Sequence, residues 1–331
     1  MLAGAVCSLG GLVFGYDLGA LSTAAPSLRA AFHLSPWLFG LTVAASLWGT
    51  VCGSIVAGRI ADEMGRPRLV AGCAALHFIA AGAFFSPFPM QSWILLLGLR
   101  FLCGLAIGGL TVGCPLYLAE IAPSSLRGFF VGSFQLQVGI GVLLAFATGA
   151  TGHHLVKNGM YWKVCLGLGA LPAGFLLLLL KFMAPTPRWL ADRHRWREAD
   201  QAADRLGFTA AEWPRNQTSN PTEWGSLHRE RLFSRKYLRP LLLATSIAVF
   251  NQLSGVNIIL LYLLDVLSNA GLNELLSHRY TVLISGFSLV ITLLSMKFVD
   301  KFGRKPLLLG GSLGMAISLF SLEAVNAFAP C

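Results

Sequence analysis

Charged side chains are scarce in this chain, and acidic ones are the scarcest. Only 12% of its 331 residues are charged, and 15 residues are Asp or Glu, whereas a soluble domain carries about 25% charged residues. The seven cysteines show no CxxC or Cys/His spacing, so the sequence indicates neither a metal site nor a redox pair. It shows no nucleophile–base pair either. The sequence therefore predicts a membrane protein that is not an enzyme and needs no cofactor.

Positive charge is present but unevenly distributed. The net charge is +10, yet the basic residues gather in alternate loops between hydrophobic runs, which argues against nucleic acid as a partner. Lys and Arg are enriched at the cytoplasmic ends of membrane spans. We therefore expect a multi-pass protein of a bacterial inner membrane or a plasma membrane. Its N-terminus would lie in the cytoplasm and its spans in the lipid bilayer.

Hydrophobic runs predict about nine membrane-spanning helices and thus an all-α fold of helical bundles. The expected spans are 2–25, 38–58, 69–87, 93–118, 129–150, 160–183, 239–265, 280–299 and 307–328. A long polar segment separates the first six from the last three. The expected domains are an N-terminal six-helix bundle (1–183), a cytoplasmic helical linker (184–238) and the first half of a second bundle (239–331).

One short charged pattern occurs twice, after the second and after the eighth span. At a constant offset of 238 (300 − 62), the residues Asp62, Gly65 and Arg66 correspond to Asp300, Gly303 and Arg304. Transporters are often built from repeated halves. The interval of six spans predicts a second half of six spans, of which three are present, so we expect the chain to be C-terminally incomplete.

Asp17 and Arg100 are single charges inside hydrophobic stretches long enough to cross a membrane. Ionisable groups at membrane depth are costly and usually functional. At ~1.5 Å per residue in a ~30 Å core, Asp17 lies ~8 Å and Arg100 ~10 Å from the same face. The two charges can then meet as an acid and its counter-charge, as a proton-coupled carrier requires. A static salt bridge between helices is the alternative.

Several spaced motifs carry a resemblance to a known family. They are 15–19 (GYDLG), 58–68 (GRIADEMGRPR), 115–128 (PLYLAEIAPSSLRG), 185–190 (PTPRWL) and 250–257 (FNQLSGVN). Together they resemble the sugar porter family of the major facilitator superfamily, which includes bacterial proton–sugar symporters and animal glucose facilitators. The resemblance implies two six-helix halves and uptake of a monosaccharide by alternating access, coupled to a proton. We expect a monomer whose small-molecule partners are a sugar and a proton.

The resemblance also implies residue roles inside the membrane. Asp17 would carry the proton and Arg100 would be its counter-charge. Amide side chains suit sugar hydroxyls because they donate and accept at once, and the expected sugar ligands are Gln135, Asn251, Gln252 and Asn257. Neighbours such as Asn251 and Gln252 cannot both face one direction on a regular helix, so we predict a broken helix with its weak point at residues 254–255. Hydrogen bonds between helices are the alternative role for these amides.

A cytoplasmic gate is implied where the charged loops meet. Its expected members are Arg59, Asp62, Arg66, Glu120, Arg127, Arg188, Asp300 and Arg304. Glu120 and Arg127 should meet the arginines of the other loops. Pro185 stands where the family commonly has an acidic residue, which removes one expected partner. Charges that merely set the topology are the alternative.

Two other functions remain open from the sequence alone. One is a proton-independent facilitator in which Asp17 is purely structural. The other is a non-transporting sugar sensor or truncated relic, because the missing last spans would complete the pocket and polar faces would otherwise meet lipid.

Overall fold

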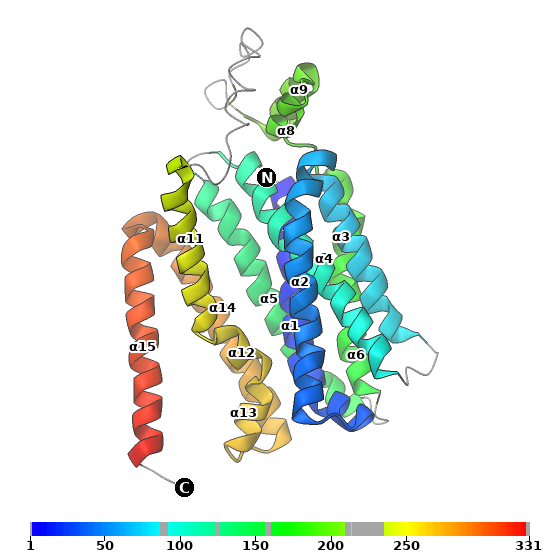
Figure 1. Ribbon diagram of the computed structural model, residues 1–331, viewed down its shortest axis with the longest axis vertical. Helices are drawn as coiled ribbons and strands as arrows, with labels where there is room; N and C mark the ends of the chain where they lie inside the picture. The colour runs from blue at the N-terminus through cyan, green and yellow to red at the C-terminus, as the bar shows by residue number, and fades with distance from the viewer. Residues whose placement is uncertain are drawn as a thin grey trace. The chain divides into compact units, whose positions relative to one another are not determined.

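The computed structural model describes residues 2–86, 92–123, 126–155, 160–208, 213 and 235–328, and every regular element among them is helical (Figure 1). The first half comprises α1 (Leu2–Phe32), α2 (Pro36–Met64), α3 (Arg66–Gly82), η1 (Ala83–Phe85), α4 (Trp93–Ile121), α5 (Arg127–Leu155), α6 (Tyr161–Gly167), α7 (Ala170–Leu179) and η2 (Leu180–Phe182). Then follow α8 (Pro187–Asp192), α9 (Trp196–Leu206), α11 (Arg235–Leu253), α12 (Val256–Leu261), α13 (Leu263–Asn269), α14 (Glu274–Phe302) and α15 (Arg304–Phe328).

Eight helical segments in the described ranges are long and apolar enough to cross a membrane, and Lys305–Ser321 is a shorter apolar helix. They correspond in order to the nine predicted spans, which confirms the all-α membrane fold. The first span is longer than predicted, since α1 continues through Pro26 to Phe32. The sixth is not one regular helix: Leu168 and Gly169 form a turn between α6 and α7.

Close backbone contact holds the first bundle together. Helix α1 packs against α5, and α2 packs against α4. A Cβ atom added at Gly15 would lie less than 3.0 Å from the backbone of Val138 in α5, and one at Gly104 equally close to the backbone of Ser46 in α2. Small residues that let helices approach are typical of packing inside membranes.

The repeated charged pattern corresponds to two similar helix junctions. Helix α2 starts with Pro36 after Ser35, whose hydroxyl accepts from the Leu38 N–H. It ends at Gly65, whose φ of 90° suits glycine, and α3 begins at the next residue. Gly303 has a φ of 82° and joins α14 to α15 in the same way.

Cα positions group the chain into two compact units, residues 1–289 and 290–331. The second consists of the end of α14 and α15. Within the first unit, α8 and α9 cap one end of the bundle, where the Trp189 indole donates to the Asp62 carbonyl over 2.9 Å. We call this the α8–α9 end. Much of the predicted linker (184–238) lies outside the described residues, and the predicted division into three domains stays a prediction.

Candidate functional site

Asp17 and Arg100 form an ion pair inside the first bundle. The Arg100 Nη1 atom lies 2.7 Å from Asp17 Oδ1, and the two side chains are 2% and 12% exposed. Close helix contacts flank the pair, since Gly15 lets α1 approach α5 and Gly104 lets α4 approach α2. A buried charge left without its partner typically costs about 3–5 kcal/mol, so this pair constrains how α1 and α4 can move.

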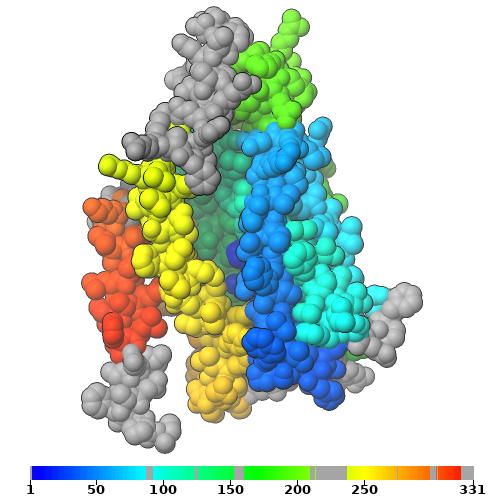
Figure 2. All heavy atoms as spheres, viewed as in Figure 1, coloured from blue at the N-terminus to red at the C-terminus, as the bar shows by residue number. Residues whose placement is uncertain are grey.

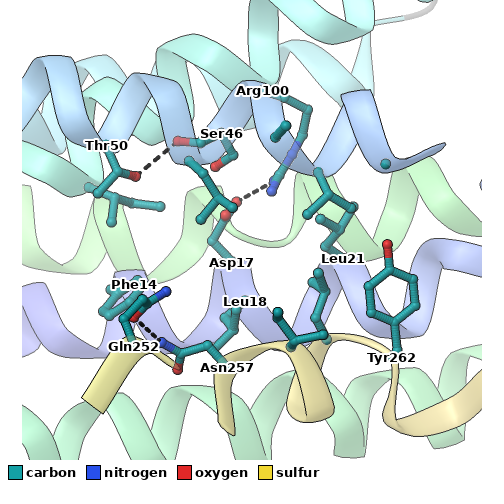
Figure 3. A pocket seen from close by; sticks show the side chains of 17 residues that line it. Phe14, Asp17, Leu18, Leu21, Ser46, Thr50, Arg100, Gln252, Asn257 and Tyr262 are labelled. Atoms are coloured by element: carbon teal, nitrogen blue, oxygen red, sulfur yellow. Dashed lines mark hydrogen bonds and ion pairs between the residues drawn. The ribbon is translucent and has the colours of Figure 1, made fainter. Parts of the chain in front are cut away.

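The pair faces a cavity of about 290 Å³, close to the lower end of the range for small-molecule sites. Helices α1, α2, α4, α11 and α12 line it, mostly with apolar side chains. Its polar lining residues are Asp17, Ser46, Thr50, Arg100, Gln252, Asn257 and Tyr262. Figure 3 shows Asp17 pointing toward Arg100, with Gln252 and Asn257 facing each other elsewhere in the pocket. Figure 2 shows a hollow between α11 and α2 on the face toward the viewer.

A break in the seventh span positions the amides. Helix α11 ends at Leu253, Gly255 adopts a φ of 74°, and α12 begins at Val256, so the predicted break at residues 254–255 is confirmed. The break lets the Asn257 amide donate to Gln252 Oε1 over 3.2 Å. Both therefore present amide groups to the same cavity from opposite sides of the break.

Two of the four expected sugar ligands are placed elsewhere. Gln135 and Asn251 are exposed and are not among the residues that line this cavity. Phe134 and Val138 belong to the buried face of α5 that packs on α1, and Gln135 lies beside this face. Asn251 precedes Gln252 on a regular turn of α11, so the two side chains point about 100° apart.

A second charged cluster lies at the α8–α9 end. The buried Arg66 guanidinium contacts Glu120 Oε1 at 2.9 Å and Asp62 Oδ1 at 3.3 Å, and it donates to the Ala61 carbonyl. The other oxygen of Glu120, Oε2, accepts from the Thr186 hydroxyl over 2.6 Å. The cluster thus ties the ends of α2, α3 and α4 to the segment before α8.

The other expected gate residues are arranged more loosely. Arg59 pairs with Glu63 on the exposed surface of α2, at 2.8 Å, rather than with Glu120. Arg127 is exposed at the start of α5, and Arg188 is exposed but close enough to Glu120 for an electrostatic interaction. The side chains of Asp300 and Arg304 lie outside the described residues.

One ion pair that the sequence did not indicate joins the two halves at the opposite end. Arg29 at the end of α1 makes two hydrogen bonds to Asp265 in α13, of 2.8 and 3.3 Å. The Arg29 guanidinium also lies 4.1 Å from the centre of the Phe39 ring, which packs edge-on against Tyr262. Because 236 residues separate Arg29 from Asp265, local sequence patterns carry no signal for this pair.

Comparison with known proteins identifies the family. The sequence model described as "Sugar (and other) transporter" matches residues 3–330. The Bacillus subtilis putative metabolite transport protein YwtG is 34% identical over 325 residues, which are 97% of this chain and 69% of that protein. The D-xylose transporter of Levilactobacillus brevis is 32% identical over 96% of this chain and 68% of its own length. The galactose-proton symporter of Escherichia coli K12 is 30% identical over 95% and 67%.

Solved structures agree with this assignment. The major facilitator superfamily proton:xylose symporter XylE, bound to 6-bromo-6-deoxy-D-glucose, matches with a TM-score of 0.86 and 26% identity over 98% of this chain and 74% of that one. XylE from E. coli in a partially occluded inward-open conformation matches with 0.82 over 99% and 80%. The chain belongs to the sugar transporter family and has the major facilitator fold. It is a multi-pass membrane protein whose relatives are transporters.

Proposed function

We propose that this protein moves a monosaccharide across a membrane by alternating access, and that a proton taken up by Asp17 drives the movement. One observation carries the proposal: the Asp17–Arg100 pair and the amides of Gln252 and Asn257 line the same cavity. An acid in that position can sense whether the cavity is occupied, and the pair can open when the carboxylate is neutralised. Relatives described as a D-xylose transporter and a galactose-proton symporter support this choice of substrates.

The two charged clusters fit the two gates that such a cycle needs. Arg29 and Asp265 would close the outer side, since they join α1 to α13. The cluster around Arg66 and Glu120 would hold the cytoplasmic ends of the first bundle, with Asp300 and Arg304 as its counterpart in the second half. This assignment places the N-terminus and the α8–α9 end in the cytoplasm. The many basic residues near that end favour it.

The test is uptake of labelled xylose and glucose by cells that lack their own sugar carriers, with and without a proton uncoupler. We expect accumulation that the uncoupler abolishes. The Asp17→Asn variant should lose accumulation but keep sugar exchange across the membrane, because an amide cannot take up the proton. Glu63→Gln is the matched control, since Glu63 is an exposed acid on α2 outside the cavity. Uphill uptake by Asp17→Asn would refute proton coupling through this residue.

A proton-independent facilitator is the second candidate. The observation that favours it is the close pairing of two nearly buried charges at 2.7 Å, because such a pair can be a permanent brace between α1 and α4. In that case wild-type uptake would equilibrate the sugar without concentrating it, and the uncoupler would have no effect.

A further inference from the structure

His77 is a buried titratable residue that the proposed function does not yet use. It lies in α3 with 0% of its surface exposed. Neither of its ring nitrogens has a hydrogen-bond partner among the residues that the structure describes. Most buried polar groups are hydrogen-bonded, and an exception needs an explanation. A neutral imidazole carries one donor and one acceptor. The backbone of Cys103 in α4 lies close enough to attract the donor, so the acceptor nitrogen is the group that is left unused.

The His77 ring lies next to Asp17, the proposed proton site. A carboxylate oxygen of Asp17 and the Cys103 sulfur lie within 4.8 Å of a ring nitrogen and of each other. Arg100, one turn before Cys103 on α4, acts on the ring electrostatically. His77 is not among the residues that line the cavity. Asp17 therefore lies between the sugar cavity and His77.

Other titratable groups near α3 are few. On α1, Tyr16 lies close to the same Gly169 position that the His77 ring approaches, and α7, with the sequence ALPAGFLLLL, has none. Helix α6 contributes Tyr161, Lys163 and Cys165. The charged groups of α2 are Arg59, Asp62 and Glu63. They lie near the start of α3, about 16 Å along α3 from His77.

We propose that His77 is a positioning residue for the proton on Asp17, an inference that rests on the proposed proton coupling. When Asp17 is ionised, Arg100 holds it at 2.7 Å. Once the carboxylate binds a proton from the cavity, it no longer attracts the guanidinium and its new O–H needs an acceptor. The unprotonated ring nitrogen of His77 supplies that acceptor after a small side-chain shift. When the proton leaves, the carboxylate returns to Arg100.

If His77 has this role, removing its ring should change the proton affinity of Asp17 without changing the contacts to the sugar. A hydrogen bond that forms only in the protonated state stabilises that state, and one such bond is worth about 1 kcal/mol, or roughly 0.5–1 pH unit. Removing the acceptor should therefore move the pH midpoint of uptake to lower pH by about that amount. The sugar KM at saturating proton concentration should not change, because His77 does not line the cavity.

The experiment measures uptake of labelled xylose from about pH 5 to about pH 8, the range in which histidine and perturbed acids respond. His77→Phe removes the acceptor, and His77→Gln keeps one. We expect the midpoint of His77→Phe to fall by about 0.5–1 pH unit and that of His77→Gln to lie near the wild-type value. Cys103→Ala is the matched control: it alters the same cluster but leaves the imidazole in place, so its midpoint should not move.

Three results would overturn the proposal. The first is an unchanged midpoint in His77→Phe, and the second is an equal shift in Cys103→Ala. The third is loss of both uptake and sugar exchange at every pH in both His77 variants when they reach the membrane, because that pattern indicates a purely structural role. A failure of proton coupling itself can be distinguished from these results, because wild-type uptake would then depend on neither pH nor the uncoupler. That result would also remove the basis of the His77 inference.

Discussion

Gly104 is a position where one added methyl group should be costly. It lies on α4, four residues after Arg100, and a Cβ atom there would come within 3.0 Å of three backbone atoms of Ser46 in α2. No flexible side chain can yield, so this contact must lengthen from 2.0 Å to at least 3.4 Å, a separation of α2 from α4 by about 1.4 Å. Ser46 and Arg100 both line the cavity, so the displacement reaches the proposed site directly.

The same helix provides the control. Gly98 is exposed on α4, and an added Cβ atom meets nothing within 4 Å. Alanine is favoured over glycine in a helix by about 1 kcal/mol, so Gly98→Ala should be neutral or slightly stabilising. Overpacking costs about 1–3 kcal/mol. Gly104→Ala has the same gain in helix propensity as Gly98→Ala, but it also has this packing cost. The difference between the two variants isolates the helix–helix contact.

We expect Gly104→Ala to unfold roughly 2–6 °C below Gly98→Ala, measured by thermal unfolding of the two purified proteins in the same detergent. Its sugar uptake should fall as well, since the Asp17–Arg100 pair lies one turn away. A melting temperature equal to or above that of Gly98→Ala would refute the argument that backbone contact between α2 and α4 fixes this part of the bundle.

Three further perturbations test other contacts. Arg29→Ala and Asp265→Ala should each weaken the contact between α1 and α13, with a coupling energy in a double-mutant cycle of about 1 kcal/mol, because the pair is partly exposed; fully additive effects on stability would contradict the pairing. Glu120→Gln removes the buried counter-charge of Arg66 and leaves only the exposed Asp62 at 3.3 Å. It should cost about 3 kcal/mol, against about 1 kcal/mol for Thr186→Val, measured by denaturant unfolding; equal losses would be inconsistent with a buried ion pair. Asn257→Ala should raise the sugar KM by roughly tenfold or more, as expected for one lost hydrogen bond that leaves a sugar hydroxyl unpaired, and an unchanged KM would remove Asn257 from the site.

Local sequence signals predicted the helices and their interruptions well. The break after Leu253 follows from residues 254–255 and from two adjacent amides, and the glycines at 65 and 303 mark both junctions of the repeat. Such features depend on the conformation of one or two residues. The turn at Leu168 and Gly169 was missed, because a long apolar run reads as one span even where the helix is interrupted.

Of the four amides expected to bind sugar, Gln252 and Asn257 line the cavity and Gln135 and Asn251 do not, for a geometric reason. Spacing along one helix says which residues share a face, and it separates Asn251 from Gln252 correctly, but it does not say which face meets the cavity. Gln135 illustrates the same limit on α5, where the face of Phe134 and Val138 packs on α1. The orientation of a helix about its own axis is set by packing against neighbours, and a single sequence does not contain that information.

Pro185 stands where the resemblance to the family implies an acidic residue. Its presence in place of an acid suggested that the charge network at the α8–α9 end would be incomplete. In the structure, the next residue, Thr186, donates to Glu120 at 2.6 Å, while Arg66 contacts the other oxygen of the same carboxylate. A carboxylate needs donors rather than a second acid, and a hydroxyl satisfies it without adding charge. The hydrogen bonding of Glu120 therefore does not depend on an acid at position 185.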